Sequence, residues 1–378
     1  MSELQQCHDL TRPLTECLDS PPVKGCVEEG MGGHPGAFTD IQLPGCNIAC
    51  GKKITGDSET ELAFYDDLYM VTGLPDYLES LKTFLPTYYP GEKCKKGDNG
   101  YFVIENIKGG VGDNVRTLDF KVGKKTAFGR DSGHMKRKKH KLLDTRFSHS
   151  DKIGFRLEGL TGESGLLEGV VDAAKKHKDD SGFEKNVLQR GKKKLQKSLY
   201  NLAPDFIFSH FFQTKKQVKD IAIELERLDR EFIEPTRRVI EATPNEQTIG
   251  FIGSSILLVI GSDGGTFKLI DFAHPKWNNT SVGCCKKSPG DLHKKVVLNY
   301  IDGLKSFIEY FTTWRNMHYN DLPDTIELRP LNIANPQEGG RKKRKTRKKR
   351  KYKYKKKRTK KKARRKRRKT RKRRRKNK

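Results

Sequence analysis

The chain has 378 residues, and its 78 Lys and Arg against 47 Asp and Glu give a formal net charge of +31, a balance typical of nucleic-acid-binding proteins. The excess lies at one end, because residues 341–378 contain 31 Lys and Arg and no acidic residue. Residues 1–340 therefore hold 47 basic and 47 acidic residues, which excludes a protein that is basic throughout. This charge-balanced part is long enough for one large bilobal domain or two ordinary ones, and so for an enzyme.

The basic tail, residues 341–378, is predicted to be disordered in isolation, because like charges repel and few apolar side chains offset the entropy of ordering. Such a tail suits RNA, DNA, polyphosphate or an acidic protein surface as its partner, and it serves equally well as a nuclear address. It resembles tails on proteins of large DNA viruses, with a cellular origin left open.

The cysteines show neither repeated C-x-x-C pairs nor a Cys/His finger spacing, so free thiols in a reducing compartment are expected instead of a zinc site. The eight are Cys7, Cys17, Cys26, Cys46, Cys50, Cys94, Cys284 and Cys285. The longest apolar run, residues 251–260, is too short to span a bilayer. We therefore expect a soluble intracellular protein, in the cytoplasm, the nucleus or both.

Structure is predicted to begin after a loose leader, residues 1–27, which mixes Pro, Cys and charge without periodicity. Two strands are expected to flank residues 32–44. Residues 58–61 (SETE) have the pattern of a capping box that opens a helix over residues 62–70. A further strand is predicted over residues 101–107.

The clearest alternation lies in residues 115–122 (VRTLDFKV), where apolar positions share one face and Asp119 and Lys121 share the other. The period of two predicts a strand with one buried face and one charged face. The charged face is a candidate for chemistry.

The second half of the chain combines helices with a hairpin. Apolar residues at steps of three and four predict a helix over residues 218–233 that ends before Pro235. Residues 251–260 and 267–272 predict a hairpin around the turn SDGGT, and residues 298–314 predict a late amphipathic helix. Strands followed by helices and a hairpin indicate two α+β lobes.

Two carboxylates at strand positions each have a basic partner nearby: Asp119 with Lys121, and Asp271 with His274. On one face of a strand, Asp119 and Lys121 suit ribose hydroxyls and a phosphate, and Asp271 at a strand end suits Mg²⁺ that bridges nucleotide phosphates. Taken singly, a surface ion pair, a capping aspartate and a turn histidine before Pro275 are equally good interpretations.

These segments resemble, in order and spacing, the inositol polyphosphate kinase family over about residues 32–311. Residues 115–123 supply the family's P-x-x-x-D-x-K-x-G pattern except its proline, which is Val115. Residues 254–257 (SSIL) resemble the later S-S-L-L element, and residues 270–274 supply I-D-F-A-H completely. Both patterns in this order are improbable by chance.

Shorter similarities agree with the longer ones. They are Gly32-Gly33-His34 with G-G-H, Glu61 to Tyr65 with E-x-x-F-Y, Glu105-Asn106-Ile107 with the hinge E-N-L, Ile153 to Arg156 with the G-x-R strand, and Tyr300 to Leu304 with Y-I-x-G-L.

The resemblance implies a bilobal, protein-kinase-like α+β fold with ATP between the lobes. The expected N-lobe spans residues 28–107 and the expected C-lobe spans residues 108–330. Within the C-lobe, residues 126–200 would form an inserted, basic, helical segment that binds the inositol phosphate. The tail, residues 341–378, would remain disordered.

The resemblance also implies roles for individual residues. Glu105 and Ile107 would offer backbone groups to adenine, Asp119 would bind ribose, Lys121 would contact the accepting inositol phosphate, and Asp271 would hold Mg²⁺. The catalytic candidates are Lys121, Asp271, His274 and Ser254, and His274 is also a candidate for substrate binding.

A phosphate-binding lysine paired with Glu61 is implied as well. Both Lys52 and Lys53 could reach the nucleotide, and Lys53 is slightly favoured. A capping-box role for Glu61 with Ser58 is an equal alternative.

The acceptor-binding candidates lie in the basic segment and are Lys136, Arg137, Lys139, His140 and Arg146. A hexakisphosphate carries roughly −9 to −12 charges and needs many cations, although a nuclear-localisation patch or a solvated face is the alternative. The G-G-H element and the heavy basic loading are most similar to the inositol hexakisphosphate kinases, which implies ATP- and Mg²⁺-dependent synthesis of a diphosphoinositol polyphosphate. The alternatives are a multikinase or trisphosphate kinase that phosphorylates hydroxyls, and an inactive kinase fold that binds polyanions.

Overall fold

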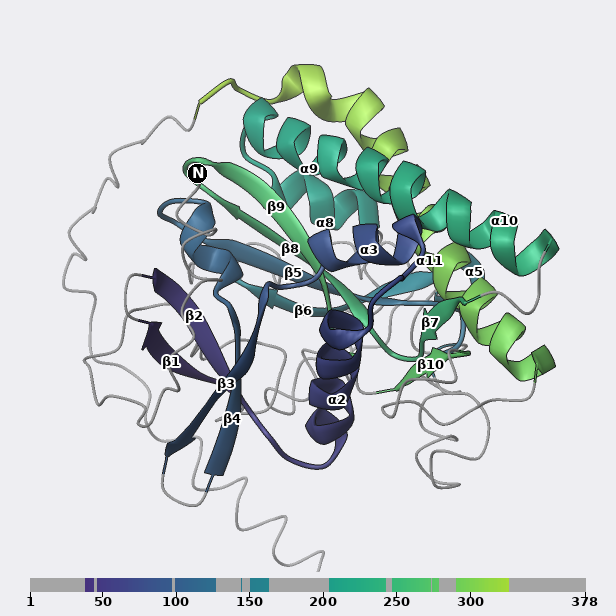
Figure 1. Cartoon of the computed structure of the whole chain (residues 1–378). Coiled ribbons are helices and arrows are strands. Elements are labelled where there is room, and N and C mark those ends of the chain that lie inside the picture. Colours follow the sequence, from purple (N-terminus) through teal and green to yellow (C-terminus); the bar gives the residue numbers. More distant parts are fainter. Residues whose placement is uncertain are drawn as a thin grey trace, which may run out of the picture. The chain divides into compact units, whose positions relative to one another are not determined.

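The computed structural model describes residues 38–43, 46–96, 99–126, 144, 150–162, 204–242, 247–272, 274–278 and 290–325. The predicted leader, the Gly32-Gly33-His34 element, most of the basic segment and the C-terminal tail lie outside these residues. The described part contains two four-stranded antiparallel sheets and the helices that pack around them (Figure 1). The predicted α+β class is confirmed.

The first sheet has the strand order β1-β2-β4-β3. Its strands are β1 (Phe38–Leu43), β2 (Cys46–Lys53), β3 (Tyr88–Lys96) and β4 (Asn99–Glu105). Strand β2 pairs with β4, with Lys52 opposite Phe102. Because side chains alternate along a strand, Lys52 shares a face with the buried Cys50, and Lys53 points to the other side. Strand β1 lies inside residues 32–44, so the expectation of two strands flanking that range is wrong.

Cys50 differs from the expectation of free thiols, because it is disulfide-bonded. Cys50 is buried, with 6% of its surface exposed. Its partner is not among the residues whose side chains the structure describes.

Helix α2 (Asp57–Met70) follows β2 and begins without a side-chain cap. Ser58 Oγ belongs to the preceding turn, where it accepts a hydrogen bond from the Thr55 N–H (2.6 Å) and donates to the Lys53 carbonyl (2.7 Å). The predicted capping box between Ser58 and Glu61 is therefore wrong, and Glu61 is left to pair elsewhere.

Two short strands, β7 (Ile249–Phe251) and β10 (Pro275–Trp277), pair in a sheet of their own. Helix α2 packs against them through Phe64, whose ring centroid lies 5.2 Å from that of Phe251 and 6.5 Å from that of Trp277. This aromatic contact fixes α2, which carries Glu61, to elements from the C-terminal half of the chain.

Helix α3 (Asp76–Thr83) packs against the turn Asp229–Ile233, and the residue after it contacts strand β9 (Gly264–Ile270) of the second sheet. The Phe84 ring stacks on Phe267 with centroids 6.1 Å apart, and the Phe84 carbonyl accepts a hydrogen bond from the Leu269 N–H (2.8 Å). The segment before β3 is thereby fastened to strand β9.

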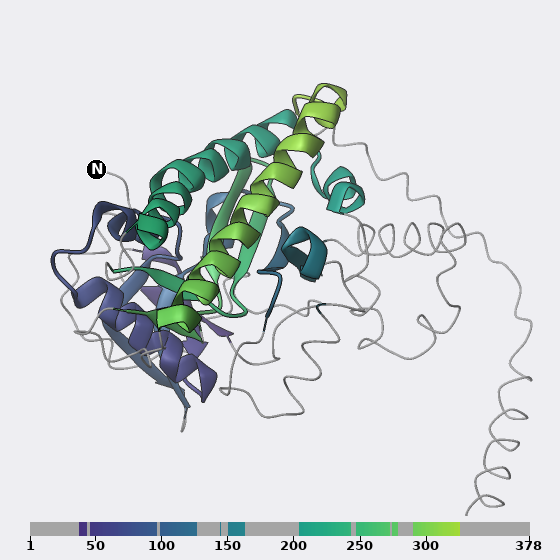
Figure 2. The same ribbon diagram turned by 90° about the vertical axis from the view of Figure 1, so that its right-hand side faces the viewer.

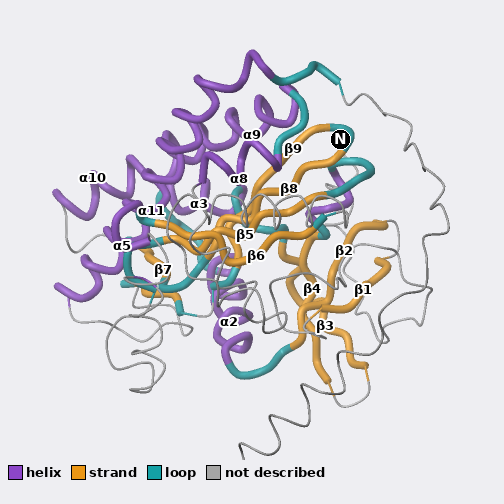
Figure 3. Tube along the Cα trace, turned by 180° about the vertical axis from the view of Figure 1, so that it is seen from behind, coloured by secondary structure: helices purple, strands orange, loops and turns teal. Residues whose placement is uncertain are grey.

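The second sheet has the strand order β6-β5-β8-β9. Its strands are β5 (Arg116–Val122), β6 (Phe155–Thr161), β8 (Ser255–Gly261) and β9 (Gly264–Ile270), with the short helix α5 (Ser150–Ile153) before β6. The predicted alternation of β5 is confirmed, because Leu118 and Phe120 are fully buried and Asp119 and Lys121 are half-buried. Figure 3 shows the two sheets as separate groups of strands.

The hairpin of β8 and β9 is confirmed, but its first strand is shorter than predicted. Residues 251–260 do not form one strand, since β7 ends at Phe251 and β8 begins at Ser255. Gly253 lies between them with a φ of 76°, a left-handed conformation that interrupts a strand and that glycine adopts without a steric cost.

The helices of the C-terminal half are α8 (Pro204–Phe211), α9 (Lys215–Leu228), α10 (Glu234–Ala242) and α11 (Gly290–His318), followed by a 3-10 turn at Tyr319–Asp321. Another 3-10 turn, Ile107–Gly110, lies between β4 and β5. Helix α9 packs along β9, and α11 packs against α8 and β7 (Figure 2). None of the helices in the described part is both long and apolar enough to cross a membrane.

The predicted helix end before Pro235 is wrong, because a π-helical turn, Asp229–Ile233, joins α9 to α10. Proline lacks an N–H and its ring clashes with the carbonyl four residues earlier. The wider π turn, in which the Glu234 N–H donates to the Asp229 carbonyl, carries the chain past this position. Lys305 of α11 braces the turn by pairing with Asp229 (2.6 Å) and Glu234 (3.1 Å).

Candidate active site

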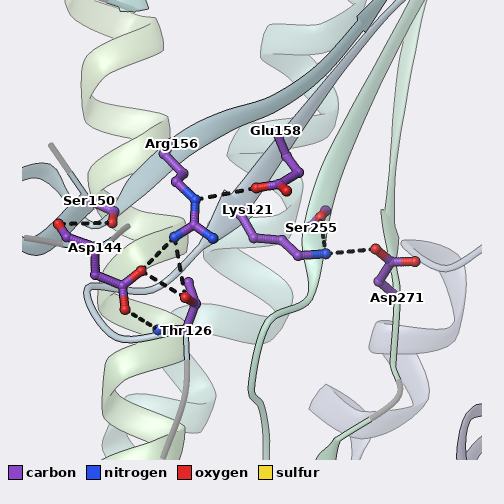
Figure 4. A network of polar contacts seen from close by, with 8 residues as sticks. All are labelled: Lys121, Thr126, Asp144, Ser150, Arg156, Glu158, Ser255 and Asp271. Carbon is purple, nitrogen blue, oxygen red and sulfur yellow. Dashed lines mark hydrogen bonds and ion pairs between the residues drawn. The ribbon is translucent and has the colours of Figure 1, made fainter. Parts of the chain in front are cut away.

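The charged face of β5 meets strand β8 in register, with Lys121 directly opposite Ser255. Lys121 Nζ donates to Ser255 Oγ (3.1 Å) and to Asp271 Oδ2 (2.7 Å), as Figure 4 shows. The structure therefore brings together Lys121 and Asp271, which are 150 residues apart in the chain.

Asp271 follows the end of β9 in a left-handed conformation, with a φ of 66°. Few residues other than glycine adopt this region, and such strain concentrates at functional sites. The Asp271 side chain is 41% exposed although it pairs with lysine, so its carboxylate is open to a ligand from solvent.

A second lysine reaches the same carboxylate from the first sheet. Lys52 Nζ lies 2.7 Å from Glu61 Oε2 and 3.5 Å from Asp271 Oδ1. The four residues Glu61, Lys52, Asp271 and Lys121 form a row of alternating charges, hereafter the charge row, which joins α2, β2, the end of β9 and β5.

The structure pairs Glu61 with Lys52, so the slight preference for Lys53 in this pairing is wrong. The reason is the alternation of β2, which directs neighbouring side chains to opposite faces. Glu61 is 3% exposed, and a buried carboxylate needs a cation or hydrogen-bond donors to offset its desolvation.

The charge row favours the ionised form of each of its lysines and of Asp271. Burial acts against charge at Lys52, but Glu61 and Asp271 outweigh it and raise the pKa of Lys52. At Lys121, burial is likewise outweighed by Asp271 and Asp119, which raise its pKa. Burial also opposes ionisation of Asp271, yet the Lys121 and Lys52 ammonium groups hold the pKa of that carboxyl below its usual range.

Asp119 lies beside this row and behaves differently. Burial raises the pKa of Asp119 to about 6, although the Lys121 charge acts in the opposite direction. Its Oδ1 atom is buried and accepts no hydrogen bond within the described residues. An acceptor oxygen without a donor suits a ligand hydroxyl group.

The expected hinge residues connect the two sheets between β4 and β5. The Glu105 carboxylate accepts hydrogen bonds from the Thr87 N–H (2.9 Å) and hydroxyl (3.1 Å) and pairs with Lys268 (3.5 Å). Asn106 Oδ1 accepts from the Lys108 N–H (3.2 Å) and caps the 3-10 turn that begins at Ile107. These side-chain contacts fix the backbone of the segment.

Of the remaining predicted site residues, the structure describes Ser254 and His274 and does not describe the five in the basic segment. Ser254 lies beside the Tyr300 hydroxyl, and the neighbouring Ser255, not Ser254, accepts the hydrogen bond from Lys121. His274 is half-buried, and its carbonyl accepts from the Ile252 N–H (3.2 Å), which leaves its side-chain role a prediction. The acceptor-binding candidates Lys136, Arg137, Lys139, His140 and Arg146 lie outside the described residues.

Sequence reasoning missed the role of Ser255 and the buried carboxylate of Asp144, which binds Arg156 (Figure 4). Strand alternation could have distinguished Ser255 from Ser254, because neighbouring residues of a strand point to opposite faces and only one of the two serines can face Lys121. Asp144 gave no signal, because its partners lie 12 and 18 residues away in the chain.

No group of three or more His, Cys, Asp or Glu side chains in the described part could hold a metal by itself. Asp271 offers one solvent-accessible carboxylate in an ionised state. This donor set fits Mg²⁺, which protein sites commonly bind through one or two carboxylates together with substrate phosphates and water.

A family model described as inositol polyphosphate kinase matches residues 101–312, more than half of the chain. The chain belongs to the inositol polyphosphate kinase family. It is therefore an inositol phosphate kinase, a phosphotransferase. Its charge row includes Lys121 of the D-x-K pattern, which was expected to contact the inositol phosphate, and Asp271 of the I-D-F-A-H pattern, which was expected to hold Mg²⁺.

Two solved structures are similar to the chain at low identity. The inositol phosphate multikinase Ipk2 from S. cerevisiae, in complex with ADP and Mn²⁺, is 18% identical with a TM-score of 0.42, covering 71% of this chain and 99% of that one. An inositol phosphate multikinase studied by protein engineering is 20% identical with a TM-score of 0.41, covering 67% and 98%. Comparison with curated protein sequences gives no significant match.

The raised pKa of Asp119 makes a prediction about stability. Its folded value of about 6, against 3.8 for the free side chain, means that the folded protein binds more protons than the unfolded protein between these pH values. The resulting stabilisation is present below pH 3.8 and is lost as the pH rises through about 6. The side chain of Asp119→Asn stays neutral at every pH. We therefore expect its free energy of unfolding, relative to that of the wild type, to increase by about 1–3 kcal/mol when the pH is raised from 4 to 7.5.

The measurement is urea unfolding followed by tryptophan fluorescence at both pH values. Asp263→Asn in the exposed β8–β9 turn controls for replacing an aspartate. If the difference in unfolding free energy between Asp119→Asn and the wild type is the same at both pH values, or is larger at pH 4, the pKa of Asp119 is not raised in the folded protein.

Proposed function

We propose that this family member is an ATP-dependent inositol hexakisphosphate kinase that produces a diphosphoinositol polyphosphate and ADP. The observation that carries the nucleotide part of the proposal is the charge row of Glu61, Lys52, Asp271 and Lys121. It places one ammonium group on each side of an ionised, accessible carboxylate, an arrangement that suits a metal–polyphosphate ligand.

Nucleotide binding is assigned to residues of both sheets. Lys52, held by Glu61, binds ATP phosphates, and the backbone groups of Glu105 and Ile107 bind adenine. Asp119 binds the ribose hydroxyl groups, and its buried acceptor oxygen supports this role, because a ligand hydroxyl would supply the missing donor.

Asp271 is the proposed ligand for Mg²⁺. When bound, Mg²⁺ neutralises charge on the nucleotide phosphates and helps to align them for transfer. Asp271 itself is kept ionised over the physiological pH range by Lys121 and Lys52, so it needs no deprotonation before it binds the cation. The Lys52 ammonium group lies 3.5 Å from Asp271. When the nucleotide is bound, Lys52 exchanges this contact with Asp271 for contacts with the ATP phosphates.

Lys121 is assigned to the acceptor side of the reaction. An oxygen of a phosphate on the inositol ring attacks the γ-phosphorus of ATP, the bond from that phosphorus to the β–γ bridging oxygen breaks, and ADP leaves. Lys121 binds and orients the attacking phosphate group. Since phosphoryl transfer depends mainly on positioning and on charge neutralisation, the reaction needs no dedicated aspartate base, and a phosphate acceptor is already ionised.

The choice of a hexakisphosphate rests on the sequence. The five basic candidates Lys136, Arg137, Lys139, His140 and Arg146 lie between β5 and β6 in the chain, and β5 and β6 pair with Lys121 opposite Arg156. A segment that leaves and re-enters the sheet beside Lys121 is suited to a ligand with roughly −9 to −12 charges.

The tail, residues 341–378, is proposed to act apart from catalysis, as a tether to nucleic acid, polyphosphate or an acidic surface or as a nuclear address. Its 31 Lys and Arg without any acidic residue support binding by charge alone, which is strongly dependent on salt. A location in the cytoplasm, the nucleus or both remains part of this proposal.

The function is tested by incubating the purified chain with ATP, Mg²⁺ and each of a panel of inositol phosphates, followed by separation of the products. We expect a product with one more phosphate than inositol hexakisphosphate, with and without residues 341–378. Phosphorylation of free hydroxyls on lower inositol phosphates alone would show a multikinase instead. No product from any acceptor would indicate an inactive kinase fold.

The two adjacent lysines of β2 give a matched pair of variants. Lys52→Met should raise the KM for ATP and lower kcat, together a loss of roughly 10- to 100-fold in kcat/KM, because a charge-assisted contact is removed. Lys53→Met, on the opposite face of the strand, should change kcat/KM little. Lys52→Met combined with Glu61→Gln removes the unpaired buried carboxylate and separates loss of folding from loss of phosphate binding. An equal loss in Lys53→Met, or full activity in Lys52→Met, would remove Lys52 from the site.

A further inference from the structure

A buried cluster of polar side chains lies next to Lys121, at the β5–β6 edge of the second sheet. Asp144 Oδ1 accepts hydrogen bonds from Arg156 Nη1 (2.5 Å) and from the Thr126 hydroxyl (2.7 Å), and Oδ2 accepts from the Thr126 N–H (3.0 Å). Arg156 Nη1 also donates to Thr126 Oγ1 (3.2 Å), and Ser150 Oγ donates to the Asp144 carbonyl (3.4 Å). We call Thr126, Asp144, Ser150 and Arg156 the Asp144 cluster.

The cluster is adjacent to Lys121 through both the sheet and the chain. Arg156 lies directly opposite Lys121 in the pairing of β5 with β6, and Thr126 follows Lys121 by five residues. Figure 4 shows the Lys121 and Arg156 side chains on neighbouring strands, with the cluster on one side of Lys121 and Asp271 on the other. Arg156 and Lys121 are therefore cross-strand neighbours.

The charges of the cluster are balanced around Arg156. Its guanidinium group pairs with Asp144 and, through Nε, with Glu158 (3.3 Å). Glu158 acts electrostatically on Lys121 and Asp119, raising the pKa of both. Without Arg156, an uncompensated carboxylate would face the region where a polyanionic acceptor binds.

Arg156 is enclosed by the protein in this arrangement. It is 4% exposed, Asp144 is 5% exposed and Ser150 is fully buried. Buried ion pairs contribute little net stability compared with apolar residues of the same volume, and their best-supported use is to specify one arrangement. The cluster specifies how the chain leaves β5 at Thr126 and re-enters β6 after Ser150.

We propose that Asp144 is a positioning residue for the inositol phosphate acceptor and not for ATP. Its carboxylate binds Thr126, which follows β5, and Arg156 of β6, and so fixes residue 144 to both strands beside Lys121. The inference rests on the proposed function in one respect, that the acceptor binds on this side of Lys121. The nucleotide residues Lys52 and Asp271 lie on the other side of Lys121.

The test compares the full chain with Asp144→Asn. Calorimetry gives the Kd for inositol hexakisphosphate and for ADP, and steady-state kinetics give the KM for acceptor and for ATP. We expect the acceptor Kd and KM to rise roughly 10-fold, because a charge-assisted buried contact is lost. The Kd for ADP and the KM for ATP should change less than about twofold.

Two further variants control the test. Asp151→Asn, at an exposed position of α5, should leave all four constants unchanged. Asp144→Asn combined with Arg156→Gln should bind acceptor better than Arg156→Gln alone, because Asp144→Asn removes the buried carboxylate that Arg156→Gln deprives of its cation. If Asp144→Asn fails to fold, Thr126→Val, which removes one donor to Asp144 and keeps the side-chain shape, should give a smaller effect of the same selectivity.

An equal loss of ADP and acceptor binding would show a merely structural role and overturn the proposal, as would unchanged acceptor binding in both Asp144→Asn and Thr126→Val. Failure of the proposed function has a different signature. In that case the wild-type chain binds hexakisphosphate without phosphorylating it, and the comparison of binding constants still decides the role of Asp144.

Discussion

One carboxylate, Asp271, is held between two lysines that come from different sheets, and the arrangement of the site depends on this constraint. Lys52 reaches it from the first sheet and Lys121 from the second. In the absence of a ligand, the lysines neutralise the carboxylate that would hold the metal, and the carboxylate neutralises the lysines that would hold phosphates. The site can therefore be assembled by folding alone, without a lasting excess of buried charge.

The rest of the fold brings these groups together. Phe64 fixes α2, and with it Glu61, to β7 and β10, while Phe84 fastens the segment before β3 to β9. Asp271 follows β9 with a positive φ, and its carboxylate lies between the two lysines. On the acceptor side, Asp144 continues the same principle, with a buried carboxylate that holds a cation beside Lys121.

The parts of the site that follow from local pattern could be predicted from the sequence. The alternation of β5 was enough to place Asp119 and Lys121 on one face, and the hairpin and the I-D-F-A-H pattern were enough to place Asp271 at a strand end. What depends on contacts distant in sequence was not predictable in this way. Lys52 and Lys53 are equivalent in composition, and only the register of β2 against β4 and the position of α2 select Lys52. The π turn at Pro235 likewise depends on packing against α11, which contributes Lys305.

Electron paramagnetic resonance of Mn²⁺ with the full chain, with and without ADP, measures whether Asp271 holds the metal. If Asp271 is the protein ligand of the metal, the wild type should bind Mn²⁺ tightly only when ADP is present, because the lysines neutralise the free carboxylate. Asp271→Asn, which tolerates the same left-handed backbone, should lose this binding while Asp263→Asn in the exposed turn retains it. Equal, ADP-dependent Mn²⁺ binding by Asp271→Asn and wild type would contradict the account.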